Sequence, residues 1–187
     1  MPEKLPVHFS KGEFRSLLAN LKEPVLKDIC LFAALTGLRQ GEILNLDWKN
    51  IDLERRLISV SNTEAFLTKS GKCRIVPMNN DVFELLSRRS LLKSCSLYVF
   101  HLKGEQLTQS YVGHKFKKGI RDAHLNEALR FHSLRHTFAT WLVQSGANIY
   151  EVQKLLGHSD IRTTEIYSHL AASELHSAVE KISLPQN

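Results

Sequence analysis

The sequence predicts an α+β fold, in which a mainly helical single domain carries a small three-stranded antiparallel sheet. Apolar residues recur at the spacing of amphipathic helices through most of the chain, and short runs typical of strands gather between residues 57 and 77. The 187 residues are 43% hydrophobic, which is enough for one sizeable core and argues for one domain.

The first part of the chain is predicted to be helical. Ser10 and Glu13 form a capping-box pattern before an apolar set with helical spacing. A second helical pattern runs from Leu26 to Ala33 and ends at Thr36-Gly37, and a short helix follows from about Gln40 to Leu46.

Three short strands are predicted next, at Leu57 to Val60, Ala65 to Thr68 and Arg74 to Pro77. Ser70-Gly71 supplies the tight turn between the last two. Another short extended piece is expected from Leu97 to Phe100.

The remaining chain is predicted to form five further helices. One of them begins at the cap residues Asn148 and Glu151, and Gly157 is its natural C-terminal stop. The other four are expected from Asp81 to Arg89, from Gln109 to Arg121, from His132 to Gln144 and, mostly as helix, from Thr163 to Glu180. Residues 183–187 are expected to form a tail.

Charge and cysteine content narrow the function classes. The formal net charge of +6 favours an anionic partner, and nucleic acid is the commonest one. Cys30, Cys73 and Cys95 form no CxxC pair, which argues against a disulfide framework or a zinc ribbon and fits a reducing cytoplasm. No apolar run approaches the roughly 20 residues that span a bilayer, and no secretion signal is visible.

The most informative segment is His-Ser-Leu-Arg-His at residues 132–136. His132 and Arg135 lie three residues apart and share a helix face. Arginine offers a planar fork of donors that matches phosphate oxygens, and histidine exchanges a proton near neutral pH, so the pair suits a phosphate. His136 is interpreted as a structural histidine.

Other candidate residues also have ordinary structural interpretations. Arg39 lies at a helix start, where it can be a surface arginine paired with Glu42. Lys69 lies at a hairpin tip, where exposed lysines usually only improve solubility. His158 lies just past a helix end, where it can interact with the helix dipole, and Tyr167 can be a packing residue.

A metal site is the natural rival for nine histidines. His132 and His136 have the i, i+4 spacing of HExxH zinc sites, but no glutamate follows His132, and no acidic pair is placed to hold magnesium. No metal or other cofactor is therefore expected. Two arginines, a lysine, two histidines and a tyrosine are instead the groups that cut a phosphodiester without a metal, by charge stabilisation, proton transfer and nucleophilic attack.

At these residues the chain resembles the tyrosine recombinase, or phage integrase, family, from about Phe9 to Ala178. The strongest segment runs from His132 to Thr140 and is followed at the expected interval by Leu156-Gly157-His158 and Tyr167. The resemblance implies the catalytic domain of a site-specific DNA recombinase, or integrase. Such an enzyme cleaves and rejoins DNA through a 3′-phosphotyrosine intermediate, with chemistry like that of type IB topoisomerases.

The resemblance assigns the phosphate-binding roles. Arg39 and Arg135 match the two arginines that clamp the scissile phosphate. His158 matches a position that hydrogen-bonds the same phosphate, and Glu42 matches the acidic residue that supports the site.

The resemblance also assigns the nucleophile and the groups that move protons. Tyr167 matches the nucleophile that joins the 3′ phosphate, and His132 matches the general base or acid beside it. Lys69 matches the hairpin lysine that protonates the leaving 5′ oxygen, with Lys72 as a nearby alternative.

Double-stranded DNA is the partner that the resemblance implies. The family usually carries an N-terminal helical DNA-binding domain, and only a few residues precede Ser10, so residues 1–187 are expected to be the catalytic domain without it. A full-length relative works as a tetramer on paired sites, whereas the isolated domain is expected to be a monomer.

Basic residues on one predicted helix are candidate contacts to DNA phosphates, or simply a solvated face: Lys115, Lys117, Lys118 and Arg121. The alternative to the enzyme is a non-catalytic DNA-binding protein that kept the fold.

Overall fold

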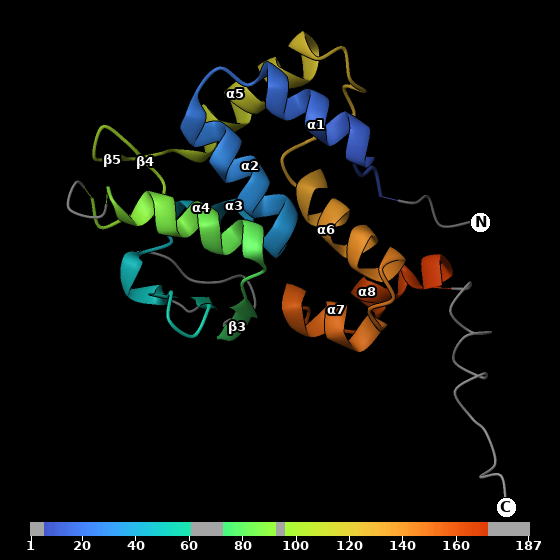
Figure 1. The fold of residues 1–187 in the computed structure, drawn as a ribbon. Helices are drawn as coiled ribbons and strands as arrows, with labels where there is room; N and C mark the ends of the chain where they lie inside the picture. Colours follow the sequence, from blue (N-terminus) through green and yellow to red (C-terminus); the bar gives the residue numbers. More distant parts are fainter. Residues whose placement is uncertain (1–5, 61–72, 93–95, 172–187) are drawn as a thin grey trace, which may run out of the picture.

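Helices α2 (Pro24–Thr36) and α6 (Ser133–Gln144) pack against each other at the centre of the fold, and the other helices surround them (Figure 1). The computed structural model describes residues 6–60, 73–92 and 96–171. Both central helices are buried on most of their faces, which includes Phe32 on α2 and Leu134 on α6. A polar side chain on α6 is therefore held in the interior, where it needs a partner.

The remaining helices divide into two groups. Helices α1 (Lys11–Asn20) and α5 (Gln109–Asp122) pack together at one end of the molecule. Helices α7 (Ile149–Leu156) and α8 (Arg162–Glu165) lie at the other end (Figure 1). Helix α4 (Asn80–Ser90) packs on α2, and the short α3 (Gln40–Leu44) contacts both α2 and α5.

The predicted caps are present at the helix ends. Ser10 and Glu13 form the capping box of α1, and Asn148 and Glu151 form that of α7. Gly37 ends α2 with a left-handed backbone, φ 67°, and a Cβ atom there would come within 2.4 Å of the Phe138 ring. Glycine is thus required at this turn both by the backbone and by the packing, and the turn leads directly into the loop before α3.

A three-stranded antiparallel sheet is present, as predicted, but its described strands differ from those expected. Its order is β1 (Ile51–Asp52), β2 (Leu57–Val60) and β3 (Arg74–Pro77). The first strand was not predicted, because two residues are too few to show a period. The predicted strand at Ala65 to Thr68 and the turn at Ser70-Gly71 lie outside the described residues.

Smaller elements complete the described fold. Strands β4 (His101–Leu102) and β5 (Glu105–Gln106) form a second antiparallel pair. The segment predicted to be extended, Leu97 to Phe100, is held by an isolated bridge between Tyr98 and Asp47. A 3₁₀ helix, η1 (Trp48–Asn50), precedes β1.

The predicted helix from Thr163 to Glu180 is wrong within the described residues. Helix α8 ends at Glu165, a turn follows, and the 3₁₀ helix η3 covers Ser168–Ala171. The β-branched residues before and in this turn lower its helix propensity, and Ile166 and Tyr167 pack against the core cluster around Phe138. Tyr167 therefore lies in a turn that tertiary packing holds in place.

Candidate active site

A polar cavity of about 330 Å³ lies where the loop before α3, the start of α6 and the end of α7 meet. Four of the predicted site residues line it: Arg39, His132, Arg135 and His158. Gly157, Ser159 and Thr163 complete the lining. A larger hollow of about 430 Å³ lies near Trp141 and Pro77, but most of its lining is apolar, so the smaller cavity is the one suited to a phosphate.

Arg39 is held at the cavity by Glu42, which is buried one turn later. The Glu42 carboxylate accepts hydrogen bonds from the backbone N–H of Arg39 at 2.8 Å and from its Nη1 at 3.1 Å. Burial alone would raise the pKa of Glu42, but hydrogen bonds and charges from Arg74 and Arg39 outweigh it and leave the pKa below its ordinary value. The predicted pairing of Arg39 with Glu42 is therefore present, and it leaves the Arg39 side chain 23% exposed toward the cavity.

Arg135 enters the cavity from the buried side of α6. Its Nη1 donates to the Gly37 carbonyl at 2.7 Å and its Nη2 donates to the Leu156 carbonyl at 2.6 Å. These carbonyls end α2 and α7, so one guanidinium joins the two helix ends that frame the cavity. Burial, together with the nearby charge of Arg39, lowers the pKa of Arg135 to about 9, so the group stays charged at neutral pH.

His158 lies just past α7 and lines the same cavity. Its Nδ1 lies 2.9 Å from the hydroxyl of Thr164, a residue that is fully buried. Burial and the charges of Arg135, Arg39 and Arg74 lower the pKa of His158 to about 4, so the ring is neutral at pH 7. A neutral ring whose Nδ1 is engaged by Thr164 presents Nε2 as its other hydrogen-bonding group.

Tyr167 is buried and does not belong to the cavity lining. Its hydroxyl lies 2.5 Å from Nδ1 of His136, and burial raises the pKa of Tyr167 to about 12. Burial, with the neighbouring His132, lowers the pKa of His136 to about 4. His136 thus directly contacts the predicted nucleophile, a contact that sequence spacing does not reveal because the two residues lie 31 positions apart.

His132 lies at the N-cap of α6, one position before the helix starts, and its side chain is exposed at the cavity. Its ring stacks edge-on against His136, with 4.9 Å between the ring centroids. The row from His132 through His136 to Tyr167 therefore connects the cavity to the buried hydroxyl.

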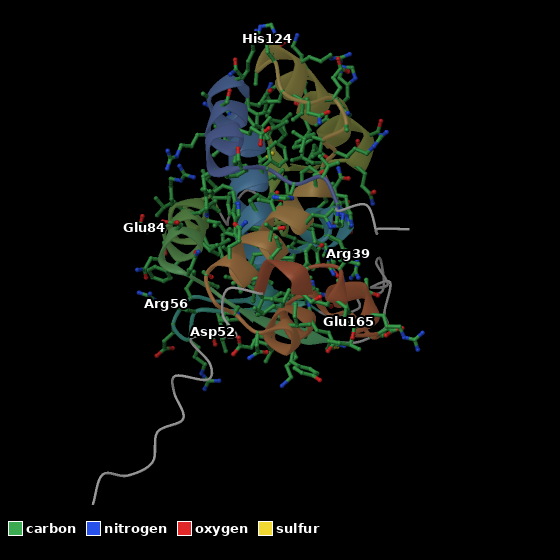
Figure 2. The ribbon with its side chains drawn as sticks, turned by 90° about the vertical axis from the view of Figure 1, so that its right-hand side faces the viewer. Arg39, Asp52, Arg56, Glu84, His124 and Glu165 are labelled. Atoms are coloured by element: carbon green, nitrogen blue, oxygen red, sulfur yellow. The ribbon has the colours of Figure 1, made fainter. Side chains whose placement is uncertain are left out.

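Two of the predicted basic contacts on α5 are engaged within the protein. Lys115 forms an ion pair with Glu23, and the Lys117 ammonium donates to the Glu127 carbonyl. Lys118 and Arg121 are exposed. Helix α5 begins beside the site, where Gln40 donates to the Gln109 carbonyl, and runs away from it toward His124 at the far end of the molecule (Figure 2).

Sequence reasoning missed Arg74, the first residue of β3, which donates two hydrogen bonds to Glu42 at 2.9 and 2.7 Å. Its place at the start of a short strand carried no chemical signal. Lys69 and Lys72 lie outside the described residues, in the segment that joins β2 to β3.

The charges of the described site are those of an anion-binding site. Arg39 and Arg74 hydrogen-bond to the Glu42 carboxylate, and Arg135 interacts with it through charge alone, so these four groups together carry a net charge of about +2 at neutral pH. In the part of the chain that the structure describes, no group of three or more His, Cys, Asp or Glu side chains could hold a metal ion. The cavity is suited to binding and polarising a phosphate.

No described helix has the length and apolar character needed to cross a bilayer.

Neutral His136 and His158 predict a loss of stability in acid. In the unfolded chain both bind a proton below about pH 6.5, whereas in the folded chain they do so only near pH 4. The unfolded state therefore binds more protons in this window, and stability that is present above pH 6.5 is lost as the pH falls toward 4. We expect the melting temperature to fall by several degrees, since 1 kcal/mol corresponds to roughly 2–4 °C for a chain of this size.

Thermal melts between pH 7.5 and 4.5 measure this effect. His136→Asn and His158→Asn should each flatten the dependence of melting temperature on pH, whereas His124→Asn, at an exposed position, should leave it unchanged. The same slope in all four proteins would contradict the prediction.

Known proteins are similar to this chain in sequence and in fold. A sequence model of the phage integrase family matches residues 9–174. Tyrosine recombinase XerD of Vibrio cholerae is 36% identical over 189 residues, which cover 94% of this chain and 61% of the relative. The crystal structure of XerA recombinase superposes with a TM-score of 0.76 at 28% identity, covering 99% of this chain and 68% of that one. XerH site-specific recombinase bound to its difH substrate, after cleavage, gives a TM-score of 0.71 at 27% identity, covering 95% and 53%.

The described fold thus matches that of solved recombinases. The chain spans about three fifths of the length of the curated relatives that match most of it.

Proposed function

Because the chain belongs to the phage integrase family, we propose that it is the catalytic domain of a site-specific DNA recombinase that uses Tyr167 as its nucleophile. The observation that carries the proposal is the cavity at which Arg39 and Arg135 meet, each held by buried acceptors, with neutral His158 beside them. Two fixed guanidinium groups neutralise the oxygens of a phosphodiester as charge builds up in the transition state.

The proposed reaction exchanges one phosphate ester for another. The Tyr167 oxygen forms a bond to phosphorus, the bond from phosphorus to the 5′ oxygen breaks, and the 5′ hydroxyl leaves with a proton. The Tyr167 proton must go to a base, because the pKa of about 12 keeps the phenol protonated at neutral pH. His132 is the proposed base or acid at this step, and the reverse reaction rejoins the strand without a cofactor.

Tyr167 must leave His136 before it can attack. Its hydroxyl is hydrogen-bonded to His136, and the side chain is outside the cavity lining. A buried tyrosine also favours the second candidate, a DNA-binding protein that kept the fold without its chemistry. The two candidates differ in one product, the covalent protein–DNA adduct.

The proposed function is tested by trapping that adduct. The protein is incubated with nicked duplexes that carry a randomised segment, in EDTA, and products are separated on a denaturing gel. A nick close to the cleavage site lets the short 5′-hydroxyl strand diffuse away, so the phosphotyrosine accumulates. A covalent adduct supports the enzyme, whereas DNA binding without any adduct supports the non-catalytic alternative.

Double-stranded DNA in the cytoplasm is the proposed substrate, with Lys118 and Arg121 as exposed candidate phosphate contacts. To contact DNA phosphates, Lys115 and Lys117 must release their partners within the protein. Exchange of strands between two duplexes requires a tetramer on paired sites for the full-length protein.

The chain alone is expected to be a monomer, because the contacts of a recombination complex need DNA and partner protomers. Sedimentation velocity of the DNA-free protein over a range of concentrations measures its mass. A stable tetramer without DNA would count against this expectation.

Lys69 is the proposed general acid. A positioned acid that protonates the leaving 5′ oxygen contributes on the order of 100-fold or more, so Lys69→Ala should slow cleavage by at least that factor. The bridging 5′ oxygen is then replaced by sulfur, which leaves as a thiolate without needing a proton. We expect Lys69→Ala to cleave this substrate at a rate close to that of wild type.

Lys72→Ala is the matched control from the same segment. Rescue of Lys72→Ala alone would assign the acid to Lys72, and an equal defect of Lys69→Ala on both substrates would make Lys69 a phosphate contact only.

A further inference from the structure

We propose that Arg74 is a positioning residue that holds both phosphate-binding arginines at the cavity. The inference rests on the proposed function, since it assigns to Arg74 a role in that reaction. Arg74 is nearly buried, with 8% of its side chain exposed, and it does not line the cavity. Arg74 therefore makes no direct contact with a phosphate in the cavity, and its positioning effect passes through the residues that it contacts.

The first of these contacts leads to Arg39. Glu42 Oε1 accepts from Nη1 of both Arg74 and Arg39, at 2.9 and 3.1 Å. Glu42 Oε2 accepts from Arg74 Nη2 at 2.7 Å and from the backbone N–H of Arg39 at 2.8 Å. Each oxygen is thus shared between the two arginines.

This sharing limits how strongly Glu42 holds Arg39. With Arg74 present, the Arg39 guanidinium makes a single bond to the carboxylate and keeps part of its surface at the cavity. Without Arg74, a buried carboxylate would have Arg39 as its remaining guanidinium partner within hydrogen-bonding distance. Carboxylates favour two-point pairing with arginine, so Arg39 would be drawn toward Glu42 and away from a phosphate.

The second contact leads to Arg135. Arg74 Nε donates to the Leu155 carbonyl at 3.0 Å, and the next carbonyl along the chain, that of Leu156, accepts from Arg135. The stem of Arg74 also packs on Gly157, where a Cβ atom would come within 2.8 Å of Arg74 Cδ. Arg74 therefore fixes the end of α7, which presents the Leu156 carbonyl to Arg135 and carries His158 into the cavity.

A purely structural role for Arg74 is the competing explanation, and Arg89 offers a matched control for it. Arg89 is equally buried, with 7% of its side chain exposed. It also pairs with a carboxylate, that of Asp28, and its Nε also donates to a backbone carbonyl, that of Val99. Since Arg89 contacts none of the cavity residues in these interactions, it has the same architecture without the connection to the site.

The test compares Arg74→Met with Arg89→Met in single-turnover adduct formation on the nicked duplex. Misplacing a catalytic group by about 1 Å costs on the order of 100-fold in rate, so we expect Arg74→Met to slow the reaction by roughly 10- to 100-fold. DNA affinity should change less than about 3-fold, because no group that faces the phosphate is removed. Arg89→Met should form the adduct at the wild-type rate once the folded fraction has been matched.

A double-mutant cycle with Arg39→Ala separates positioning from general destabilisation. If Arg74 acts largely through Arg39, Arg74→Met should cost much less in the Arg39→Ala background than in the wild type. The same factor in both backgrounds, or an equal rate loss in Arg89→Met, would overturn the proposal.

NMR signals of Arg39 test the positioning role without a need for enzymatic activity, so this test is independent of the test of the proposed function. The ¹⁵N–¹H signals of the Arg39 guanidinium, assigned by their loss in Arg39→Lys, should shift in Arg74→Met and stay in place in Arg89→Met. Unshifted Arg39 signals in Arg74→Met would overturn the positioning role. A wild-type protein that forms no adduct but shows the expected shifts would overturn the proposed function alone.

Discussion

Tyr167→Phe is expected to form no covalent adduct and to bind DNA with nearly unchanged affinity. The substitution removes one hydroxyl and no charge, so the electrostatic part of DNA binding remains. The ring stays in the cluster of Phe138, Val152 and Leu156. The lost hydroxyl is the atom that would join the phosphate, and no phosphotyrosine can form at position 167 without it.

The structure adds a second expected effect of this substitution. The Tyr167 hydroxyl is hydrogen-bonded to Nδ1 of His136, and removal of one partner of a buried hydrogen bond costs about 1–3 kcal/mol. Tyr167→Phe should therefore melt at a lower temperature than the wild type, while both remain folded at 25 °C.

Tyr150→Phe is the matched control, because Tyr150 lies on α7 and is 70% exposed. Adduct formation is measured on a denaturing gel, and affinity is measured by fluorescence anisotropy. We expect Tyr150→Phe to behave like the wild type in both assays. An adduct of equal yield from Tyr167→Phe would mean that another residue is the nucleophile.

Features fixed by neighbouring residues could be predicted from the sequence. The capping boxes of α1 and α7 and the glycine ends of α2 and α7 depend on residues within one turn of each other, and all are present. The pairing of Arg39 with Glu42, one turn apart, is local as well. The spacing of His132 and Arg135 also indicated their shared place at the cavity.

Features fixed by distant residues could not be predicted in this way. The contact between His136 and Tyr167 and the bonds from Arg74 to Glu42 each join separate elements, so no spacing in the sequence reveals them. The helix predicted from Thr163 failed for the same reason, since packing against the core cluster around Phe138 decides the path of the chain at Tyr167. Apolar periodicity describes a helix face and not the turn that a buried tyrosine requires.

Arg135→Ala is expected to reduce the rate of adduct formation by about 100- to 1000-fold, the usual effect of removing one donor that stabilises transition-state charge. It should also destabilise the fold. The carbonyls of Gly37 and Leu156 would each lose their guanidinium donor, at about 1–3 kcal/mol for each buried group left unpaired.

The rate and the stability are therefore measured separately. Single-turnover rates at 25 °C are corrected for the folded fraction, which is obtained from urea unfolding of each variant. Arg130→Ala serves as the control, because Arg130 is exposed and lies just before α6. Loss of a cation used only for affinity reduces the dependence of binding on salt and leaves the rate of the bound complex unchanged.

Arg135→Lys separates the effect of the positive charge from that of the planar guanidinium. Lysine keeps the charge but lacks the planar fork that spans two carbonyls and a phosphate, so we expect it to recover only a small part of the lost rate. If charge alone mattered, Arg135→Lys would react nearly as fast as the wild type. An Arg135→Ala protein that binds DNA weakly but reacts at the wild-type single-turnover rate would remove Arg135 from the chemistry and leave it as the link between the ends of α2 and α7.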